Sequence, residues 1–257
     1  MSLDDTAARA TALLDLHRDP RLLTVVNVWD AISAQVVTGL AGTVALATAS
    51  HSIAASRGYE DGENIPVDEM VEEVRRIVAA TTLPVTADLE GGYGDAAETV
   101  RKAIGVGVVG ANIEDQMKPL AEAAAQVEAV MAAAASAGVP DFVLNARTDA
   151  FVKGVDDPLA EAVTRGKAFL DAGAPVVFVP GMLDEQQVAT LVEAFGPQRL
   201  TTIGLPGTPS LARLEELGVA RVSYGPLSQR VALTALAELV EAVHAGGGVP
   251  EGTRPLN

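Results

Sequence analysis

The chain alternates regularly between short apolar runs rich in β-branched residues and longer segments with helical periodicity. The short runs predict eight strands, at Leu23–Asn27, Thr43–Ala49, Pro84–Asp88, Val108–Ile113, Phe142–Ala146, Val176–Val179, Leu200–Ile203 and Val219–Tyr224. Helices are expected between them and after the last, at Asp30–Gly39, Val67–Ala80, Ala96–Ile104, Glu122–Ala137, Pro158–Ala172, Glu185–Phe195, Ser210–Leu217 and Leu227–Val243. This alternation favours a parallel sheet whose strands are joined by crossover helices.

Eight strand–helix units with mostly short connections predict an α/β fold, a TIM (β/α)₈ barrel that forms a single domain over residues 1–245. An extra helix, at about Asp4–Leu16, precedes the first strand. The Gly- and Pro-rich residues 246–257 are expected to form a flexible tail. A doubly wound open sheet is the alternative, but it usually has fewer strands and often a glycine-rich first turn, which is absent after Asn27.

The charge and residue composition exclude several classes of function. A net charge of −16 disfavours nucleic acid and anionic membranes as partners, and an anionic substrate would need a local cation. The absence of cysteine excludes disulfides, thiolate metal sites and cysteine nucleophiles. The first 19 residues lack the apolar region of a signal peptide, and no apolar stretch reaches the roughly 20 residues that span a bilayer, so we expect a cytoplasmic protein.

Carboxylates collect at the carboxyl ends of the predicted strands, where the active sites of (β/α)₈ barrels lie. Asp88 and Glu90 follow the third strand, with side chains on one face if the strand extends that far, and Glu114 follows the fourth. Oxygen ligands of this kind suit Mg²⁺, with Mn²⁺ as an alternative. The other reading is that acids cap helix N-termini, which we expect for Asp95 and Asp149.

Five segments resemble the isocitrate lyase / phosphoenolpyruvate mutase superfamily in order and spacing, from about Val26 to Gly225. They are NVWDAISAQV, ALATASHSIAASRGYEDG, VTADLEGGYGD, GANIEDQ and VLNARTDAF. The resemblance, to a phosphonomutase-like member, implies a TIM barrel with Mg²⁺ and an enolate-type intermediate. It also implies a homo-oligomer, a tetramer or a dimer.

The resemblance also implies roles for residues at matching positions. Asp88 resembles the residue closest to the metal, and Asp61, Glu90 and Glu114 resemble its outer carboxylates, some of which act through water. Arg147 resembles the arginine that holds the substrate's carboxylate or phosphonate, a contact suited to a bidentate guanidinium. A buried ion pair with one of the acids is the alternative for Arg147.

Further substrate contacts are expected at Ala49 and Ser50, which match a Ser-Gly pair of the family, and at Asn145. At Ala49 the family's hydroxyl is missing, and Ser50 is the candidate to replace it. Trp29 lies at the predicted barrel mouth, where packing against the protein is favoured over a substrate contact.

Catalytic candidates are Arg147, Glu114, His51 and Tyr93. His51 is a candidate acid or base because histidine titrates near neutrality, although local hydrogen bonds in a loop would explain it equally well. Tyr93 would donate a proton or pack under the glycine-rich turn. His17 and His244 are interpreted as structural residues of terminal helices.

The resemblance stops after the fourth strand. Lyases of the family carry a mobile loop with a Lys-Arg-Cys-Gly-His motif there, whereas residues 115–121 read DQMKPLA. This difference argues against cysteine-dependent cleavage of isocitrate or methylisocitrate. Lys118 is the one basic residue in the loop, and a solvated lysine at a helix start is the favoured interpretation.

Three functions remain open from the sequence. The first is a Mg²⁺-dependent lyase or decarboxylase acting on a small 2-oxo or 2-hydroxy (di)carboxylic acid. The second is a phosphonopyruvate-type C–P mutase or hydrolase, and the third is a non-catalytic barrel that binds a metabolite.

Overall fold

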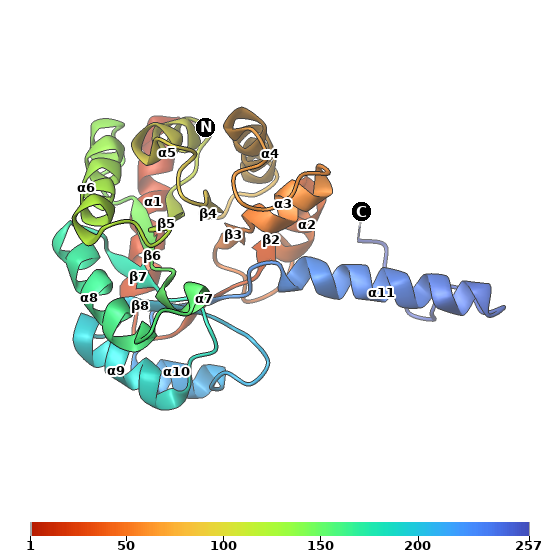
Figure 1. Cartoon of the computed structure of the whole chain (residues 1–257). Helices are drawn as coiled ribbons and strands as arrows, with labels where there is room; N and C mark the ends of the chain where they lie inside the picture. Colours follow the sequence, from red (N-terminus) through yellow and green to blue (C-terminus); the bar gives the residue numbers. More distant parts are fainter. Residues whose placement is uncertain (1, 257) are drawn as a thin grey trace.

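A barrel of parallel strands surrounded by helices forms the body of the molecule in the computed structural model, which describes residues 2–256 (Figure 1). The strand order is β1-β9-β8-β7-β6-β5-β4-β3-β2. β1 (Leu23–Val25) and β2 (Asn27–Val28) are two pieces of the first predicted strand. Because β1 pairs with β9 and β2 pairs with β3, this strand joins both edges of the sheet and closes the barrel. The prediction of a (β/α)₈ barrel is confirmed.

Five of the seven remaining strands are shorter than the runs that predict them, and the other two, Val143–Arg147 and Leu200–Ile203, have the predicted length. They are β3 (Leu46–Thr48), β4 (Val85–Asp88), β5 (Gly110–Glu114), β6 (Val143–Arg147), β7 (Val176–Phe178), β8 (Leu200–Ile203) and β9 (Arg221–Ser223). The helices are α1 (Leu3–Arg18), α2 (Ala31–Thr38), α3 (Ser50–Ser56), α4 (Val67–Ala79), α5 (Ala96–Gly105), α6 (Leu120–Ser136), α7 (Ala150–Lys153), α8 (Pro158–Asp171), α9 (Glu185–Phe195), α10 (Leu211–Leu217) and α11 (Leu227–His244).

Two short helices, α3 and α7, are absent from the prediction. With 7 and 4 residues they span two turns or fewer, which is too short for an apolar stripe to repeat at helical spacing. Their polar residues, such as Ser50 and His51, therefore look like loop residues in the sequence. Both helices directly follow a strand, so they change the geometry of the barrel mouth.

Helix α1 packs across the amino-terminal ends of several strands. Leu13 and His17 are completely buried, and Leu13 lies so close to Gly110 at the start of β5 that a Cβ there would be 3.0 Å from it. The Nδ1 atom of His17 lies 2.8 Å from the carbonyl oxygen of Leu13, and burial lowers the pKa of His17 to about 3. The structural role predicted for His17 is confirmed, and α1 forms the floor of the barrel.

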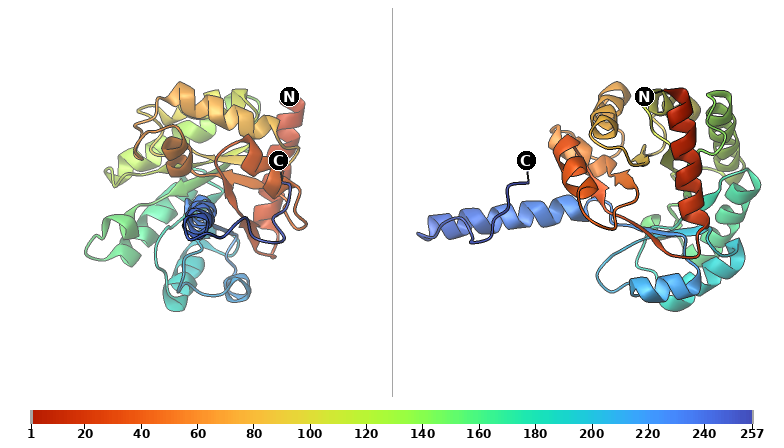
Figure 2. Two further views of the ribbon diagram at one scale, coloured as in Figure 1. Left: turned by 90° about the vertical axis from the view of Figure 1, so that its right-hand side faces the viewer. Right: turned by 180° about the vertical axis from the view of Figure 1, so that it is seen from behind.

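Helix α11 leaves the barrel and extends away from it, and residues 246–256, which form neither helix nor strand, follow it (Figures 1 and 2). In its first turn Gln229 is buried, and its amide nitrogen donates to the Ser52 carbonyl and the Ser56 hydroxyl of α3. The rest of α11 is almost entirely exposed. Within residues 2–256, none of the helices combines the length and the apolar character that crossing a bilayer requires.

We expect Leu13→Ala to lower the free energy of unfolding by about 2–5 kcal/mol, because it leaves a cavity in the floor of the barrel. Urea unfolding followed by circular dichroism measures the change. Leu3→Ala on the same helix is the control, since Leu3 is 54% exposed and its truncation should cost less than about 0.5 kcal/mol. Equal losses in the two variants would contradict the role given to α1.

Candidate active site

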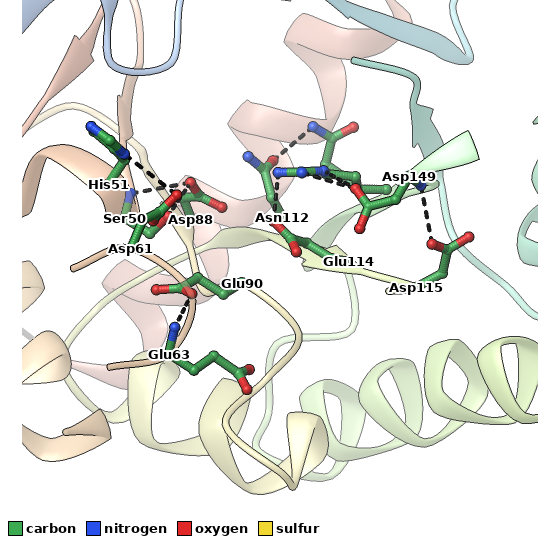
Figure 3. Close-up of polar contacts among 12 residues, drawn as sticks. Ser50, His51, Asp61, Glu63, Asp88, Glu90, Asn112, Glu114, Asp115 and Asp149 are labelled. Carbon is green, nitrogen blue, oxygen red and sulfur yellow. Dashed lines mark hydrogen bonds and ion pairs between the residues drawn. The ribbon is translucent and has the colours of Figure 1, made fainter. Parts of the chain in front are cut away.

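The carboxyl ends of β4, β5 and β6 place their last polar side chains on one face of the sheet. Asp88 is in register with Asn112, and Glu114 is in register with Arg147. In-register residues of neighbouring strands point to the same side, so these side chains face the barrel interior and its mouth. Figure 3 shows Asp88, Glu90 and Glu114 gathered there.

Asp88 is the most firmly held acid of the group. One of its oxygens, Oδ2, accepts hydrogen bonds from the Ser50 backbone amide at 3.1 Å and from the Ser50 hydroxyl at 2.8 Å. Its own amide donates to the Thr48 hydroxyl at 2.9 Å. The other oxygen, Oδ1, is buried and has no hydrogen-bond partner within residues 2–256. A buried carboxylate oxygen without a partner is costly, so this atom is the natural position for a ligand.

Glu90 reaches the site from a turn rather than from a strand. β4 ends at Asp88, and Glu90 has φ 53°, so the strand does not extend to Glu90 and the alignment expected on that condition does not arise. The Glu90 carboxylate accepts from the Glu63 backbone amide and from the Tyr93 hydroxyl, the latter at 3.1 Å. Burial, together with the charges of Asp88 and Asp61, raises the pKa of Glu90 to about 7.

Tyr93 has its hydroxyl bound to Glu90 and its backbone bound to the segment before α4. The Tyr93 amide donates to the Glu63 carboxylate at 2.6 Å. Burial and the Glu90 charge raise the pKa of Tyr93 above its ordinary value, so its hydroxyl keeps its proton. The structure places the Tyr93 hydroxyl against the Glu90 carboxylate.

Arg147 bridges two acids at the mouth. Its Nη1 lies 2.5 Å from Glu114, and its Nε and Nη2 each lie 2.8 Å from Oδ1 of Asp149. Burial raises the pKa of Glu114 to about 8 although Arg147 lowers it, and the charges of Asp88, Asp149 and Glu90 add to the rise. The ion pair considered as the alternative for Arg147 is therefore present.

The two acids expected to cap helices behave differently. The Asp95 carboxylate accepts from the Glu98 amide at 3.0 Å and caps α5, which confirms the expectation. Asp149 precedes α7 but makes no side-chain cap bond, and it orients Arg147 instead. The expectation for Asp149 is wrong because an ion pair with a buried guanidinium outweighs a contact to a four-residue helix.

His51 and Asp61 lie at the rim of the mouth. The His51 Nδ1 is 3.4 Å from the Asp61 carboxylate, and the two side chains are 41% and 52% exposed. His51 belongs to the first turn of α3, so the alternative of a loop histidine is wrong. The next residue of α3, Ser52, and its neighbour Ile53 are buried, which fixes the helix on the barrel.

The predicted substrate contacts divide into two groups. Ala49 and Ser50 lie at the mouth next to Asp88, although the Ser50 hydroxyl is already bound to that carboxylate. Asn145 is completely buried, with its amide donating to Asn112 at 2.7 Å and its oxygen accepting from Thr201 at 2.6 Å. The structure therefore places Asn145 inside the barrel, below the mouth.

Trp29, the remaining predicted contact, is partly buried and packs against the core. It lines an apolar groove of about 310 Å³ together with Val26, Ile32, Val36 and Val37. This environment agrees with the favoured interpretation that Trp29 is a packing residue.

The short connection after β5 is tied down by a residue that the sequence did not indicate. Arg165 of α8 is 5% exposed and donates to the Asp115 carboxylate at 3.2 Å and to the Lys118 carbonyl at 2.9 Å. The Lys118 amine donates to Gln126 at 2.8 Å. Arg165 lies 50 residues from Asp115 in the chain, and no local pattern signals a contact over such a distance.

The acids fit a hard cation that binds mainly through water. No group of three or more His, Asp or Glu side chains in the described part of the chain is close enough to hold a metal directly. Mg²⁺ typically takes one or two carboxylates and keeps several waters. Asp88 with its unpartnered Oδ1 fits the direct ligand, and Glu90, Glu114 and Asp61 fit the outer positions.

The fold and this mouth define a class of α/β-barrel proteins. The chain matches the family described as phosphoenolpyruvate phosphomutase over residues 13–244, and it belongs to that family. It is 30% identical to 2,3-dimethylmalate lyase of Eubacterium barkeri, covering 93% of this chain and 86% of the lyase. It is also 30% identical to an oxaloacetate decarboxylase of Pseudomonas syringae pv. tomato, covering 86% and 82%.

A solved structure, of a putative phosphonomutase from Burkholderia cenocepacia J2315, is 40% identical to the chain. It superposes with a TM-score of 0.85, covering 92% of this chain and 98% of that one. Relatives of the chain thus include both lyases and a protein described as a phosphonomutase.

We expect the metal-free protein to lose stability as the pH rises from about 4.5 to about 8. Glu90 and Glu114 have pKa values of about 7 and 8 in the folded chain, above the value of 4.5 for a free glutamate. The folded state therefore binds more protons in this range, and stability falls as those protons leave. Thermal unfolding in EDTA across the pH range measures the slope.

Glu114→Gln should remove part of this slope, because glutamine does not titrate. Glu122→Gln, at an exposed position of α6, should leave the slope as it is in the wild-type chain. Stability that is flat over this pH range in the wild-type chain would contradict the account of the acid cluster.

Proposed function

We propose that the chain is a Mg²⁺-dependent lyase or decarboxylase that cleaves a C–C bond in a small 2-oxo or 2-hydroxy (di)carboxylic acid through an enolate intermediate. The observation that carries the proposal is Asp88, a half-buried acid with one carboxylate oxygen fixed by Ser50 and the other buried without a partner in the described chain. The cation would supply positive charge beside the 2-oxo group, where negative charge grows as the bond breaks.

Arg147 is the residue that would bind the substrate carboxylate. Asp149 holds it from one edge through Nε and Nη2, while its Nη1 contacts Glu114. Glu114, with a pKa of about 8, carries a proton at neutral pH and then holds Arg147 less strongly. A substrate carboxylate would therefore replace Glu114 at the Nη1 edge of Arg147 at a lower free-energy cost than it would replace Asp149 at the other edge.

The proton that the enolate carbon takes up has candidate donors on the same side of the barrel. The Glu114 carboxyl and the Tyr93 hydroxyl both keep their protons at neutral pH, and both lie among the acids of the mouth. His51 with Asp61 is the candidate at the rim, where exchange with solvent is easiest. No cysteine takes part, since the chain has none.

A C–P mutase or hydrolase acting on a phosphonopyruvate-like acid is the second candidate, favoured by the 40% identity to the putative phosphonomutase. A phosphonate carries more negative charge than a carboxylate and would need more cations, whereas Arg147 is the cation that contacts the acids at the mouth. Mass spectrometry of the reaction products separates the two candidates. A lyase should convert members of a 2-oxo acid panel into shorter acids, whereas a C–P mutase should rearrange phosphonopyruvate and a C–P hydrolase should release phosphate from it.

Calorimetric titration with oxalate, a stable mimic of the pyruvate enolate, tests the site directly. We expect the wild-type protein to bind oxalate only when Mg²⁺ is present. Asp88→Asn should weaken this binding by about 100-fold or more, since it removes the direct ligand's charge. Arg147→Lys should weaken it by about tenfold, because lysine lacks the planar fork.

The matched control is Asp156→Asn, which changes an exposed acid between α7 and α8 and should bind oxalate as the wild-type chain does. Oxalate binding that is independent of Mg²⁺, or unchanged in Asp88→Asn, would show that the metal assignment is wrong. Binding of oxalate without turnover of any acid in the panel would point to the third function, a barrel that binds a metabolite.

We also propose that the protein is a homo-oligomer, a dimer or a tetramer, in which α11 packs against a second copy. One face of α11 carries a stripe of aliphatic side chains at helical spacing that are 44–55% exposed: Leu233, Leu236, Val240 and Val243. A helix with such a stripe normally buries it. The apolar groove beside Trp29, with Ile32 itself 42% exposed, offers a surface of matching character.

Leu236→Glu should shift the protein toward the monomer, because it puts a charge into the apolar stripe of α11. Sedimentation velocity over a range of concentrations measures the shift. Thr234→Glu is the control, since Thr234 lies on the other side of the same helix and is exposed. A monomeric wild-type protein, or an identical mass distribution for both variants, would show that α11 does not form the contact.

A further inference from the structure

Arg221, the first residue of β9, is a charged side chain sealed inside the barrel. It is 1% exposed, and its Nε, Nη1 and Nη2 atoms have no hydrogen-bond partner in the described chain. Arg221 is in register with Thr201, whose hydroxyl binds Asn145 inside the barrel, so both side chains face the interior. A buried guanidinium without a partner costs several kcal/mol unless an opposite charge compensates it.

Two titratable groups interact electrostatically with Arg221. His17, on the floor helix α1, is neutral, since burial and then the charge of Arg221 lower the pKa of His17 to about 3. Asp88, at the mouth, is the acid whose charge acts on Arg221. Although burial lowers the pKa of Arg221 to about 10, the guanidinium stays protonated at neutral pH. Of these two neighbours, only Asp88 can therefore compensate the charge.

The acids at the mouth outnumber the arginines that contact them. Asp88, Glu90, Glu114 and Asp149 gather there, and the one arginine among them, Arg147, is already shared between Glu114 and Asp149. A substrate with one or two carboxylates would add further negative charge to this group. A fixed positive charge beneath Asp88 lowers the free-energy cost of gathering these acids and of binding a substrate carboxylate among them. The effect is sizeable because Coulomb interactions in the barrel interior are screened less than in water.

We propose that Arg221 is the internal counter-charge of Asp88, a positioning residue that makes the acidic mouth accept an anion. The role in substrate binding rests on the function proposed above, whereas the pairing with Asp88 does not. A fixed positive charge beneath the mouth has opposite effects on the two ligands: it weakens binding of a divalent cation and strengthens binding of an anion. A residue that only fills space would affect both ligands in the same direction.

A double-mutant cycle on the metal-free protein tests the pairing. Arg221→Met, Asp88→Asn and the double variant are compared by urea unfolding. Replacing a buried charge by an apolar side chain of similar volume is often tolerated, so the single variants should fold. We expect the two changes to be non-additive by a factor on the order of ten in the unfolding equilibrium constant. Additive effects would overturn the pairing.

Calorimetry with Mg²⁺ alone, and then with oxalate at saturating Mg²⁺, tests the consequence at the mouth. Arg221→Met should bind Mg²⁺ more tightly and oxalate more weakly, each by a factor on the order of ten. Arg221→Lys keeps the charge and should bind Mg²⁺ and oxalate with affinities near those of the wild-type chain. It is the variant to measure if Arg221→Met does not fold. Arg75→Met, which removes an exposed arginine of α4, controls for net charge and should change neither affinity.

The outcomes separate the two proposals. Weakening of both ligands together in Arg221→Met, or no change in either, would overturn the role given to Arg221 at the mouth. A wild-type protein that binds neither Mg²⁺ nor oxalate would overturn the proposed function instead. In that case the double-mutant cycle still decides whether Arg221 compensates Asp88, because it needs no ligand.

Discussion

Burial of several carboxylates close together at the mouth of the closed barrel governs the rest of the site. Asp88 and Glu114 come from neighbouring parallel strands, and a turn adds Glu90 beside them. Burial and mutual repulsion raise the pKa of Glu90 to about 7 and of Glu114 to about 8, so in the metal-free chain these acids hold protons near neutrality. In the function proposed above, a metal ion bound among these acids would release those protons, and the site would thereby couple metal, substrate carboxylate and proton.

The fold could be predicted because its signals are periodic and repeat eight times. Each strand is a short β-branched run, and each long helix has an apolar stripe, as in α4, where Met70, Val74 and Ile77 are buried. Helices α3 and α7 could not be predicted, since one or two turns show no period. The division of the first strand was equally invisible, because it arises from pairing with β9 on one side and β3 on the other.

The site could be predicted as a set of residues but not as a set of contacts. Strand ends bring Asp88, Glu114 and Arg147 to one mouth, and this follows from the topology of any parallel barrel. Which acid pairs with Arg147 depends on side-chain packing, and Asp149, expected to cap a helix, is one of the two partners. Arg221 was missed because a single arginine in an apolar run carries no sign of its burial.

The connections around the mouth differ in whether they contact the acids. The loop after β5 is short, and Arg165 ties both Asp115 and the Lys118 carbonyl to α8, so this loop is anchored. The segment between α3 and α4 contacts the acids instead, because Glu63 donates its amide to Glu90 and accepts from the Tyr93 amide. The same segment carries Asp61. The segment that holds Glu90 and the position of Asp61, the proposed outer carboxylate, are therefore linked, so a change that loosens the contact to Glu90 should also move Asp61.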